Sequence, residues 1–519
     1  MSRLVARGVD AVRALATSRT QAPLRRDGHL PRIWDDAFDA LPARLEEQLL
    51  RLGPPPVATP PPSTALPELF DCSDTVSPEP RVTARTYKAE LVQLTKTDHA
   101  TVDLLPLLGP DALRIALEPE RYILLPESEI DQEKVAGCKP YTDPLLKGTP
   151  AMVELAALLI CKSLALARLT KSCTIGVFTV LKKGDWLRLI FDCRPANLQC
   201  RRPNYSHLST ASTFTQLRVD RKRTNDAGYE GSLAVLDLRD SFYLFRYELL
   251  SHLFALEGTY RAADVGVTDA LDAEGNWVHV EPETLVYVCL STLPMGFAWS
   301  LFFCHDVCTN VCLDALCAYG VPRDSARDQL LVDGRPAPRL SPTLPIAAPY
   351  VDNLNFLCWS RAAARWLCDW VDRRLTSLGL AHRVECVDAP AHDVVGLRLC
   401  LRELVAYNKP ERVWKVRSAT IALLAQGRCT GYAMQVVCGL LVNLGLVSRP
   451  FLSIFSHVFS FAVSHLGRIG IFNVDMRHEL QTAIDFMLFL VASLEDRGTN
   501  FRIHVGFVKA RLRHAPWTV

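Results

Sequence analysis

The sequence has almost no net charge, no apolar run long enough to cross a bilayer, and no internal repeat. Its 519 residues hold 58 Lys and Arg against 56 Asp and Glu, a net charge of +2. Any binding to a polyanion must therefore depend on local groups of cations. The most apolar stretch, 432–463, is broken by Arg449 and Pro450, so neither half reaches the ~20 residues of a membrane span. These absences predict a soluble globular protein with no membrane partner.

The seventeen cysteines form no short-spaced pairs of the kind found in disulfide frameworks or zinc ribbons. Their scatter inside apolar runs predicts an intracellular, reducing location and leaves open whether this is the nucleus or the cytoplasm. Cys304, Cys308 and Cys312 recur at every fourth position, and His305 directly follows the first of them. This spacing is compatible with metal ligands, but it favours the buried stripe of a helix.

The first 85 residues have the composition of an appendage. Residues 1–26 carry six arginines, which favours an amphipathic helix over a transit peptide. Seven prolines fall within 53–67, and they predict an extended linker. Residues 86–149 predict a mainly helical extension, which is followed by a helix over 152–167.

The most basic part of the chain begins at a predicted hairpin. Two β-rich runs, 176–181 and 186–192, flank the turn Lys182-Lys183-Gly184-Asp185. Positions 182–223 carry ten Lys and Arg, three Asp and no Glu. Such a segment is either a solvated face or a surface that binds phosphates, and the sequence leaves both interpretations open.

Two aspartates stand at the ends of predicted strands. The run 232–236 is apolar or small throughout, as in a central strand covered on both faces, and Asp237 follows it. Asp352 lies in a second apolar run, where a tight turn at 351–354 would expose its carboxylate at a hairpin tip. Paired carboxylates suit two-metal nucleotidyl transfer, because Mg²⁺ prefers oxygen ligands. A lone aspartate at a strand end is more often a turn former or a helix cap, the role that we expect for Asp240.

The remaining segments carry less information. Polar stretches at 261–282 and 321–342 predict surface insertions without visible chemistry. A helix is predicted over 361–378, strands over 394–405, and three helical runs from residue 418 onward.

Four motifs, in this order, resemble those of the reverse transcriptases of retroelements: Trp186 to Asn197 (WLRLIFDCRPAN), Leu236 to Phe242 (LDLRDSF), Leu293 to Phe297 (LPMGF) and Tyr350 to Asn353 (YVDN). The resemblance covers about 176–399 and extends more weakly to 466. It implies an α+β right-hand polymerase, in which an antiparallel palm sheet is backed by helices. Fingers would occupy 150–230, the palm 231–405 and a helical thumb 406–466, and 467–519 have no assigned role.

The same resemblance implies an RNA-directed DNA polymerase. Such an enzyme transfers nucleotides from dNTPs to a primer 3′-hydroxyl on an RNA or DNA template, with two Mg²⁺ or Mn²⁺ ions in its site. The sequence shows no carboxylate set for a ribonuclease H module and no protease or integrase domain. Other chains would have to supply those steps for a complete element.

The resemblance assigns roles residue by residue. Phe242 would exclude a ribose 2′-hydroxyl, and Gly296 would let the backbone approach the nascent base pair. The metal-binding and catalytic residues would be Asp237 and Asp352, with Asn353 as a further metal ligand; the nucleotide-binding residues would be Lys182, Lys183, Arg188, Phe242, Met295 and Gly296; the primer and template contacts would be Arg194, Tyr350 and Gly396.

Asn353 departs from the pattern, because the family usually has a second aspartate there. An amide brings an oxygen but no charge, so it would hold a metal ion less tightly than a carboxylate. An alternative is therefore an inactive or co-opted relative that binds nucleic acid without synthesis. A third interpretation, RNA-directed RNA synthesis, is favoured by Asn353 and opposed by Phe242.

Overall fold

The computed structural model describes residues 32–56, 84–92, 101–182, 186–220 and 228–496 and the single positions 6, 59 and 61, with side chains excluded for 32–40, 220, 495 and 496. Helices and strands are mixed, and the chain divides into two compact units. Unit 1 consists of 1–81, 211–229 and 390–519, and unit 2 of 82–210 and 230–389. The chain therefore passes from one unit to the other four times.

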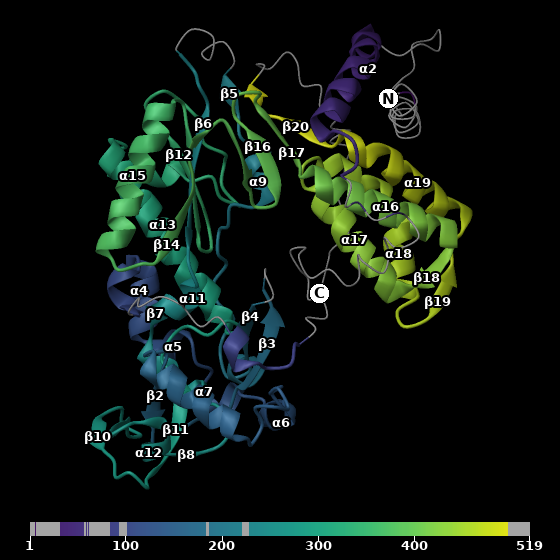
Figure 1. Cartoon of the computed structure of the whole chain (residues 1–519). Coiled ribbons are helices and arrows are strands. Elements are labelled where there is room, and N and C mark those ends of the chain that lie inside the picture. The colour runs from purple at the N-terminus through teal and green to yellow at the C-terminus, as the bar shows by residue number, and fades with distance from the viewer. Residues whose placement is uncertain are drawn as a thin grey trace. The chain divides into compact units, whose positions relative to one another are not determined.

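Unit 2 contains a four-stranded antiparallel sheet in the order β12-β13-β6-β14. Its strands are β12 (Ile346–Tyr350), β13 (Asn353–Cys358), β6 (Ser232–Leu238) and β14 (His382–Ala389). Residues 232–236 are all buried, as predicted for a central strand. Helices α13 (Ala298–Tyr319) and α15 (Arg361–Ser377) lie side by side and pack against this sheet (Figure 1). The helix predicted at 361–378 is thus confirmed.

Helix α13 supplies the core beside this sheet. Cys304, Cys308 and Cys312 are all buried in it, in agreement with the apolar-stripe interpretation. Over the described ranges, no group of three or more His, Cys, Asp or Glu side chains is placed to hold a metal ion. Over the same ranges, α13 alone is long and apolar enough to cross a membrane, and half of its most apolar stretch is buried inside the protein.

The basic hairpin has the predicted form. Strand β3 (Gly176–Leu181) pairs antiparallel with β4 (Leu187–Asp192), from Gly176 opposite Asp192 to Leu181 opposite Leu187. Of its turn, 183–185 lie outside the described residues, so the predicted role of Lys183 is not placed.

The helix predicted over 152–167 is wrong at its end. Helix α7 spans Pro150–Cys161, and the chain then turns at Ser163, whose φ is +57°. It continues as strand β2 (Ala165–Arg168), which pairs with β11 (Leu285–Leu290) and with β9 (Asp269–Leu271). Alanine and leucine favour a helix, but these backbone hydrogen bonds to distant strands decide the outcome.

The stretches predicted as insertions are built into the unit 2 fold. Residues 261–282 contribute to a five-stranded sheet, in the order β10-β9-β2-β11-β8, through β9, β10 (Trp277–His279) and the end of β8 (Tyr260–Arg261). Residues 321–342 bury Leu330, Leu331 and Leu340. Leu331 N donates to the Ala347 carbonyl at 2.8 Å, so this segment runs along β12, the edge strand of its sheet.

Short elements connect these layers of unit 2. They are β1 (Val102–Asp103), α4 (Pro110–Leu117), α5 (Pro119–Tyr122), α6 (Gln132–Gly137), α8 (Arg194–Asn197), α11 (Ser241–Leu244), β7 (Phe245–Arg246), α12 (Ala262–Val265) and α14 (Arg323–Ala326).

Unit 1 has its own four-stranded sheet, which includes the last residues of the predicted palm. The order is β15-β16-β17-β20, with β15 (Ala391–Val394), β16 (Leu397–Cys400), β17 (Val405–Asn408) and β20 (Val491–Ser493). Strands β15, β16 and β17 therefore form a sheet that β20 closes by pairing with β17, and they do not extend the sheet that holds Asp237. The neighbouring elements α9 (Ala211–Phe214), β5 (Val219–Asp220) and β21 (Glu495–Asp496) also belong to unit 1.

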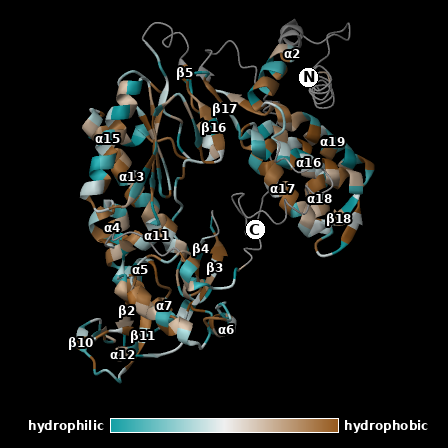
Figure 2. Ribbon diagram, in the orientation of Figure 1, coloured by the Kyte–Doolittle hydropathy of each residue, from teal (hydrophilic) through white to brown (hydrophobic). Residues whose placement is uncertain are grey.

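Four helices form the main hydrophobic core of unit 1. They are α16 (Pro410–Gln426), α17 (Gly431–Gly445), α18 (Ser456–Ser464) and α19 (Val474–Phe486), with a small ladder of β18 (Arg428–Thr430) and β19 (Ile469–Ile471). Hydrophobic and hydrophilic residues alternate along these helices, as in amphipathic helices that share a core (Figure 2).

Two helices of this core lie outside the predicted thumb. Helix α19, which lies beyond the predicted end of the thumb at 466, packs on α16 and buries Met476, Leu480 and Ala483 there. Helix α2 (Arg32–Leu52), within the predicted N-terminal appendage, buries four leucines in the same core. The buried side chains are Leu41, Leu45, Leu49 and Leu52, which recur on one face of the helix.

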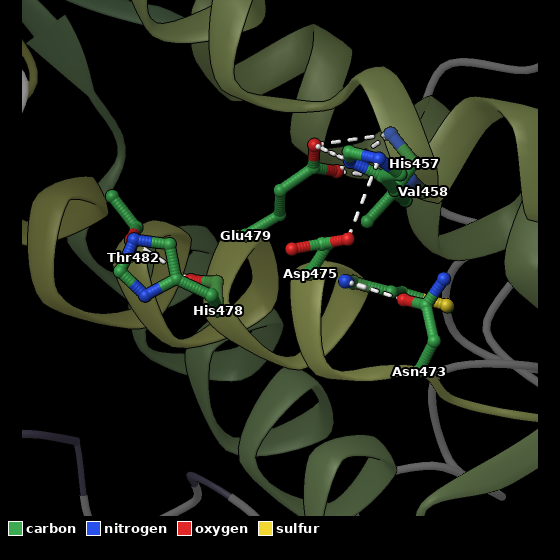
Figure 3. A network of polar contacts seen from close by, with 8 residues as sticks. His457, Val458, Asn473, Asp475, His478, Glu479 and Thr482 are labelled. Carbon is green, nitrogen blue, oxygen red and sulfur yellow. Dashed lines mark hydrogen bonds and ion pairs between the residues drawn. The ribbon is translucent and has the colours of Figure 1, made fainter. Parts of the chain in front are cut away.

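A polar network fastens α18 to α19 (Figure 3). The Glu479 carboxylate accepts hydrogen bonds from the backbone N–H groups of His457 and Val458 at 2.9–3.0 Å and contacts His457 Nδ1 at 2.9 Å. This hydrogen bond from the imidazole raises the pKa of His457. Glu479 thus caps the N-terminus of α18 from a neighbouring helix, which joins the segment after 466 to the bundle.

Candidate active site

Strand pairing brings Asp237 and Asp352 together at one edge of the unit 2 sheet. Asn353 on β13 lies opposite Asp237 on β6, and Leu238 N donates to the Asp352 carbonyl at 2.9 Å. The turn between β12 and β13 places Val351 at φ +52°, in the left-handed region. The predicted hairpin tip therefore exists, although Asp352 is half-buried and not exposed.

The Asp352 carboxylate is held by two neutral donors. Its Oδ2 accepts from the Ser241 hydroxyl at 3.3 Å, and its Oδ1 accepts from the Asn353 amide nitrogen at 3.0 Å. Burial raises the pKa of Asp352, while these hydrogen bonds and the charge of Arg188 oppose the rise. The side chain is positioned by neighbours that do not neutralise it.

Asp237 is perturbed more strongly. Burial and then the charges of Asp352 and Glu385 raise the pKa of Asp237 to about 6. Arg383 opposes this rise with a guanidinium nitrogen 3.7 Å from Asp237, but the same guanidinium also pairs with Glu385. The site thus concentrates more negative charge than its own arginine neutralises.

This charge pattern suits a divalent cation. Like charges in a partly buried site are relieved either by proton uptake or by a bound cation, and hard cations prefer carboxylate oxygens. Two carboxylates are enough for Mg²⁺, which keeps waters and substrate phosphates as its other ligands. The residues that fit this role are Asp237 and Asp352.

Asn353, for which a metal-binding role is predicted, makes a hydrogen bond to Asp352. A carboxylate can only accept a hydrogen bond, so the Asn353 group that faces Asp352 must be the amide NH₂. In this geometry Asn353 is a donor that orients Asp352, and its nitrogen is the atom next to the carboxylate.

The basic hairpin lies close to the two aspartates. Lys182 Nζ is 3.5 Å from Asp240 Oδ1, on the segment that directly follows β6. Arg188 is exposed on β4, opposite Val180. The Tyr243 hydroxyl donates to the Leu189 carbonyl at 2.7 Å and so ties α11 to β4. Lys182 therefore lies beside the segment that follows Asp237, and the charge of Arg188 acts on Asp352.

The predicted capping role of Asp240 is wrong. Asp240 occupies the position before α11, but its φ is +48° and its side chain makes no capping hydrogen bond. It pairs with Lys182 instead. Phe242, in the same short helix, is half-buried against the unit 2 core and adjoins Ser241, the donor to Asp352.

The loop that contains Met295 and Gly296 is clamped against the hairpin. Gly296 has φ +117°, and a Cβ there would lie 2.2 Å from the Phe191 carbonyl oxygen, so only glycine fits. Asn197 holds the loop from both sides: its amide nitrogen donates to the Gly296 carbonyl and its oxygen accepts from Ala298 N, each at 2.9 Å. Half-buried Met295 also accepts a backbone hydrogen bond from Phe191 N at 3.3 Å.

Sequence reasoning assigned no role to Asn197, Arg383 or Glu385. Asn197 is the last residue of the first family-like motif, and this position could have indicated a role for it in the site. Arg383 and Glu385 lie on β14, in a segment without a recognised motif, so only the register opposite Asp237 reveals them.

The three residues predicted to contact primer or template have different surroundings. Arg194 makes a bidentate ion pair with Asp192, at 2.6 and 2.8 Å, although 63% of its side chain is exposed. Tyr350 is half-buried at the end of β12, opposite Asn353, and burial followed by the Asp352 charge raises its pKa. Gly396 belongs to unit 1, in the turn between β15 and β16 with φ +80°, and so is not part of the unit that holds the two aspartates.

A scan against protein-family models and a search of curated proteins found no match. Among solved structures, the chain is similar to the foamy viral protease-reverse transcriptase in two complexes with double-stranded DNA, with 14% identity and a TM-score of 0.43 in each. The first similarity covers 78% of this chain and 64% of the other, so this chain spans just under two-thirds of that length. The second covers 76% and 74%. At this level the likeness transfers no residue role and no activity.

Proposed function

We propose that this chain is an RNA-directed DNA polymerase of the reverse transcriptase type, with a right-hand arrangement of fingers, palm and thumb. The observation that carries the proposal is the convergence of Asp237, near the end of β6, and Asp352, in the turn that leads into the neighbouring strand β13. Lys182 of the cationic hairpin lies beside Asp240, three residues after Asp237. Four motifs in the family order, read from the sequence, support it. Its partners would be a primer on an RNA or DNA template and dNTPs.

The site residues divide the chemistry among them. Asp237 and Asp352 would hold Mg²⁺ or Mn²⁺, two ions per site, which would neutralise charge on the triphosphate and the attacking hydroxyl. Lys182 and Arg188 would bind the triphosphate through charge-assisted hydrogen bonds. Ser241 and Asn353 keep the Asp352 carboxylate oriented through their hydrogen bonds. Most of the work assigned to this protein is thus positioning and charge compensation.

Two further residues would select the substrate. Phe242 adjoins Ser241 and would exclude a ribose 2′-hydroxyl by its bulk. Gly296 has no side chain where the loop meets the Phe191 carbonyl, and this close approach would define the floor under the nascent base pair.

A second candidate function is nucleic-acid binding without synthesis. It is favoured by Asn353, whose amide donates to Asp352 where a second carboxylate would add charge. It is also favoured by the pairing of Lys182 with Asp240, which occupies a cation that the proposed reaction needs.

Primer extension on an RNA template with dNTPs and Mg²⁺ or Mn²⁺ separates the two candidates. We expect extension by the parent protein and none by Asp352→Asn. Asp314→Asn is the matched control, because Asp314 is a 42% exposed carboxylate on α13 that pairs with Arg374. Tight primer–template binding without extension by the parent would establish the binding protein instead.

A further inference from the structure

Residues 201–210 form neither helix nor strand, yet hydrogen bonds fix both ends of the segment. At its start, Arg201 N donates to the Ile123 carbonyl at 2.7 Å, and the Trp299 indole donates to the Arg201 carbonyl at 2.8 Å. At its end, Ser209 N donates to the Pro349 carbonyl at 3.3 Å, and the Ser209 hydroxyl donates to the Leu331 carbonyl at 2.6 Å. The segment is therefore a preformed surface.

Asp333, from the stretch 321–342, fastens the middle of this segment. Its carboxylate accepts from the Tyr205 hydroxyl at 2.6 Å, and its carbonyl contacts His207 Nδ1 at 2.8 Å. A carbonyl only accepts, so Nδ1 carries the proton. The backbone N–H of Asp333 completes the set with a hydrogen bond to the Leu208 carbonyl at 2.9 Å.

Tyr205 is exposed although it is fixed. It is 68% accessible, and its ring meets the His207 ring edge to face with 5.1 Å between centroids. Because most of the Tyr205 ring is in contact with solvent, its burial contributes little to stability. Its hydroxyl already donates a hydrogen bond to Asp333. What it offers to a ligand is the open face of the ring.

Cations accompany this open ring. Arg202 is exposed, and the Arg201 side chain is 38% exposed, with a guanidinium nitrogen 3.7 Å from Glu129. Exposed aromatic rings interleaved with arginines suit single-stranded nucleic acid, since bases stack on the rings and arginines contact the phosphates.

We propose that Tyr205, His207, Arg201 and Arg202, held in place by Asp333, form a binding platform for single-stranded nucleic acid. Ser209 bonds to β12, the strand that leads directly into the turn with Asp352, so the platform adjoins the site. If the chain has the proposed polymerase function, the bound strand is the unpaired template, and this identification rests on that function alone. Binding itself does not depend on that function. The stretch 321–342, which has no role in the site, thereby acquires one.

The test is fluorescence anisotropy with a labelled single-stranded RNA of mixed sequence and with the same sequence as DNA. We expect Tyr205→Ala to raise Kd about 5- to 150-fold, the effect typical of losing one stacked base. Tyr205→Phe keeps the ring and loses the hydrogen bond to Asp333, so its Kd should lie between those of the parent and Tyr205→Ala. Trp277→Ala is the control, because Trp277 is a 55% exposed aromatic on β10 of the same unit; its Kd should equal that of the parent.

Primer extension by the same proteins separates this inference from the proposed function. An unchanged Kd for Tyr205→Ala, in a parent that extends primers, overturns the platform and leaves the polymerase intact. A raised Kd in a parent that never extends primers supports the platform as a binding surface and overturns the polymerase. Equal loss in Trp277→Ala and Tyr205→Ala would also overturn the platform, since it would reveal nonspecific binding.

Discussion

Replacing Asp237 with asparagine should stabilise the protein while abolishing the proposed activity. The pKa of Asp237 rises from 3.8 to about 6, chiefly through burial and then through repulsion by Asp352. Between these two values the native state holds a proton that the unfolded chain releases. The native carboxyl thus contributes stability below about pH 4, and this contribution is lost as the pH rises through 6.

The size of the effect follows from the same numbers. A shift of about two pKa units corresponds to ~3 kcal/mol at most, and solvent screening of a side chain that is 25% exposed reduces this to about 1–2 kcal/mol. Asparagine has nearly the same shape and no charge. At pH 7.5 the Asp237→Asn protein should therefore unfold with a free energy about 1–2 kcal/mol higher than the parent.

The assay is denaturant unfolding in EDTA at pH 7.5 and at pH 4, with thermal unfolding as a second measurement. At pH 7.5 the Asp237→Asn protein should be more stable than the parent, with a Tm that is higher by roughly 2–8 °C. This gain in stability should vanish near pH 4, where the parent carboxyl is protonated. Saturating Mg²⁺ should narrow the difference, because a cation that binds Asp237 stabilises only the parent.

Asp192→Asn is a control of opposite sign. Burial raises the pKa of Asp192, but hydrogen bonds from Arg194 and from Tyr141 N outweigh this effect and lower the pKa overall. Removing the charge of Asp192 should therefore destabilise the protein at pH 7.5. The reasoning is refuted if Asp237→Asn is less stable than the parent at pH 7.5, or if its gain is the same at both pH values.

Three further substitutions test the site. Gly296→Ala should reduce single-nucleotide incorporation about 100-fold, because its Cβ would displace the loop from the Phe191 carbonyl; near-parental rates would contradict the clamp. Phe242→Ala should raise the kcat/KM for ribonucleotides relative to deoxynucleotides, and an unchanged ratio would remove the proposed selection. Asn353→Asp should lower the Mg²⁺ concentration that gives half-maximal incorporation, since it adds a charge beside Asp352; an unchanged midpoint would place that side chain outside the metal site.

Local sequence patterns predicted the elements that carry the site. The buried strand before Asp237 follows from a continuous apolar run, and the hairpin around Lys182 follows from β-rich runs on both sides of a turn. The tight turn at Asp352 is likewise a feature of a few neighbouring positions. Pairing of β13 with β6 then unites the two aspartates, as their order in the family-like motifs implied.

What escaped prediction depends on partners far away in the sequence. The Asn197 clamp joins residues about a hundred positions apart. Asp240 forms an ion pair with Lys182 and makes no capping hydrogen bond to its own helix. Residues 165–168 have helical propensity but pair as a strand with β11. Single-residue propensities contain none of this information, because each outcome is decided by tertiary hydrogen bonds.

The interleaving of the two units sets an order on biosynthesis. Both parts of unit 2 have been synthesised once residue 389 is made, so this unit, with both aspartates, can fold after it emerges from the ribosome and while the rest is being translated. Unit 1 can complete its fold only after residues near 494 have been made. Arg449 donates a hydrogen bond to Ser212, Val219 N donates to the Leu494 carbonyl, and β20 pairs with β17 at the end of its sheet. A stop codon between 390 and 490 would leave the candidate active site complete on a chain whose other unit lacks its closing strand.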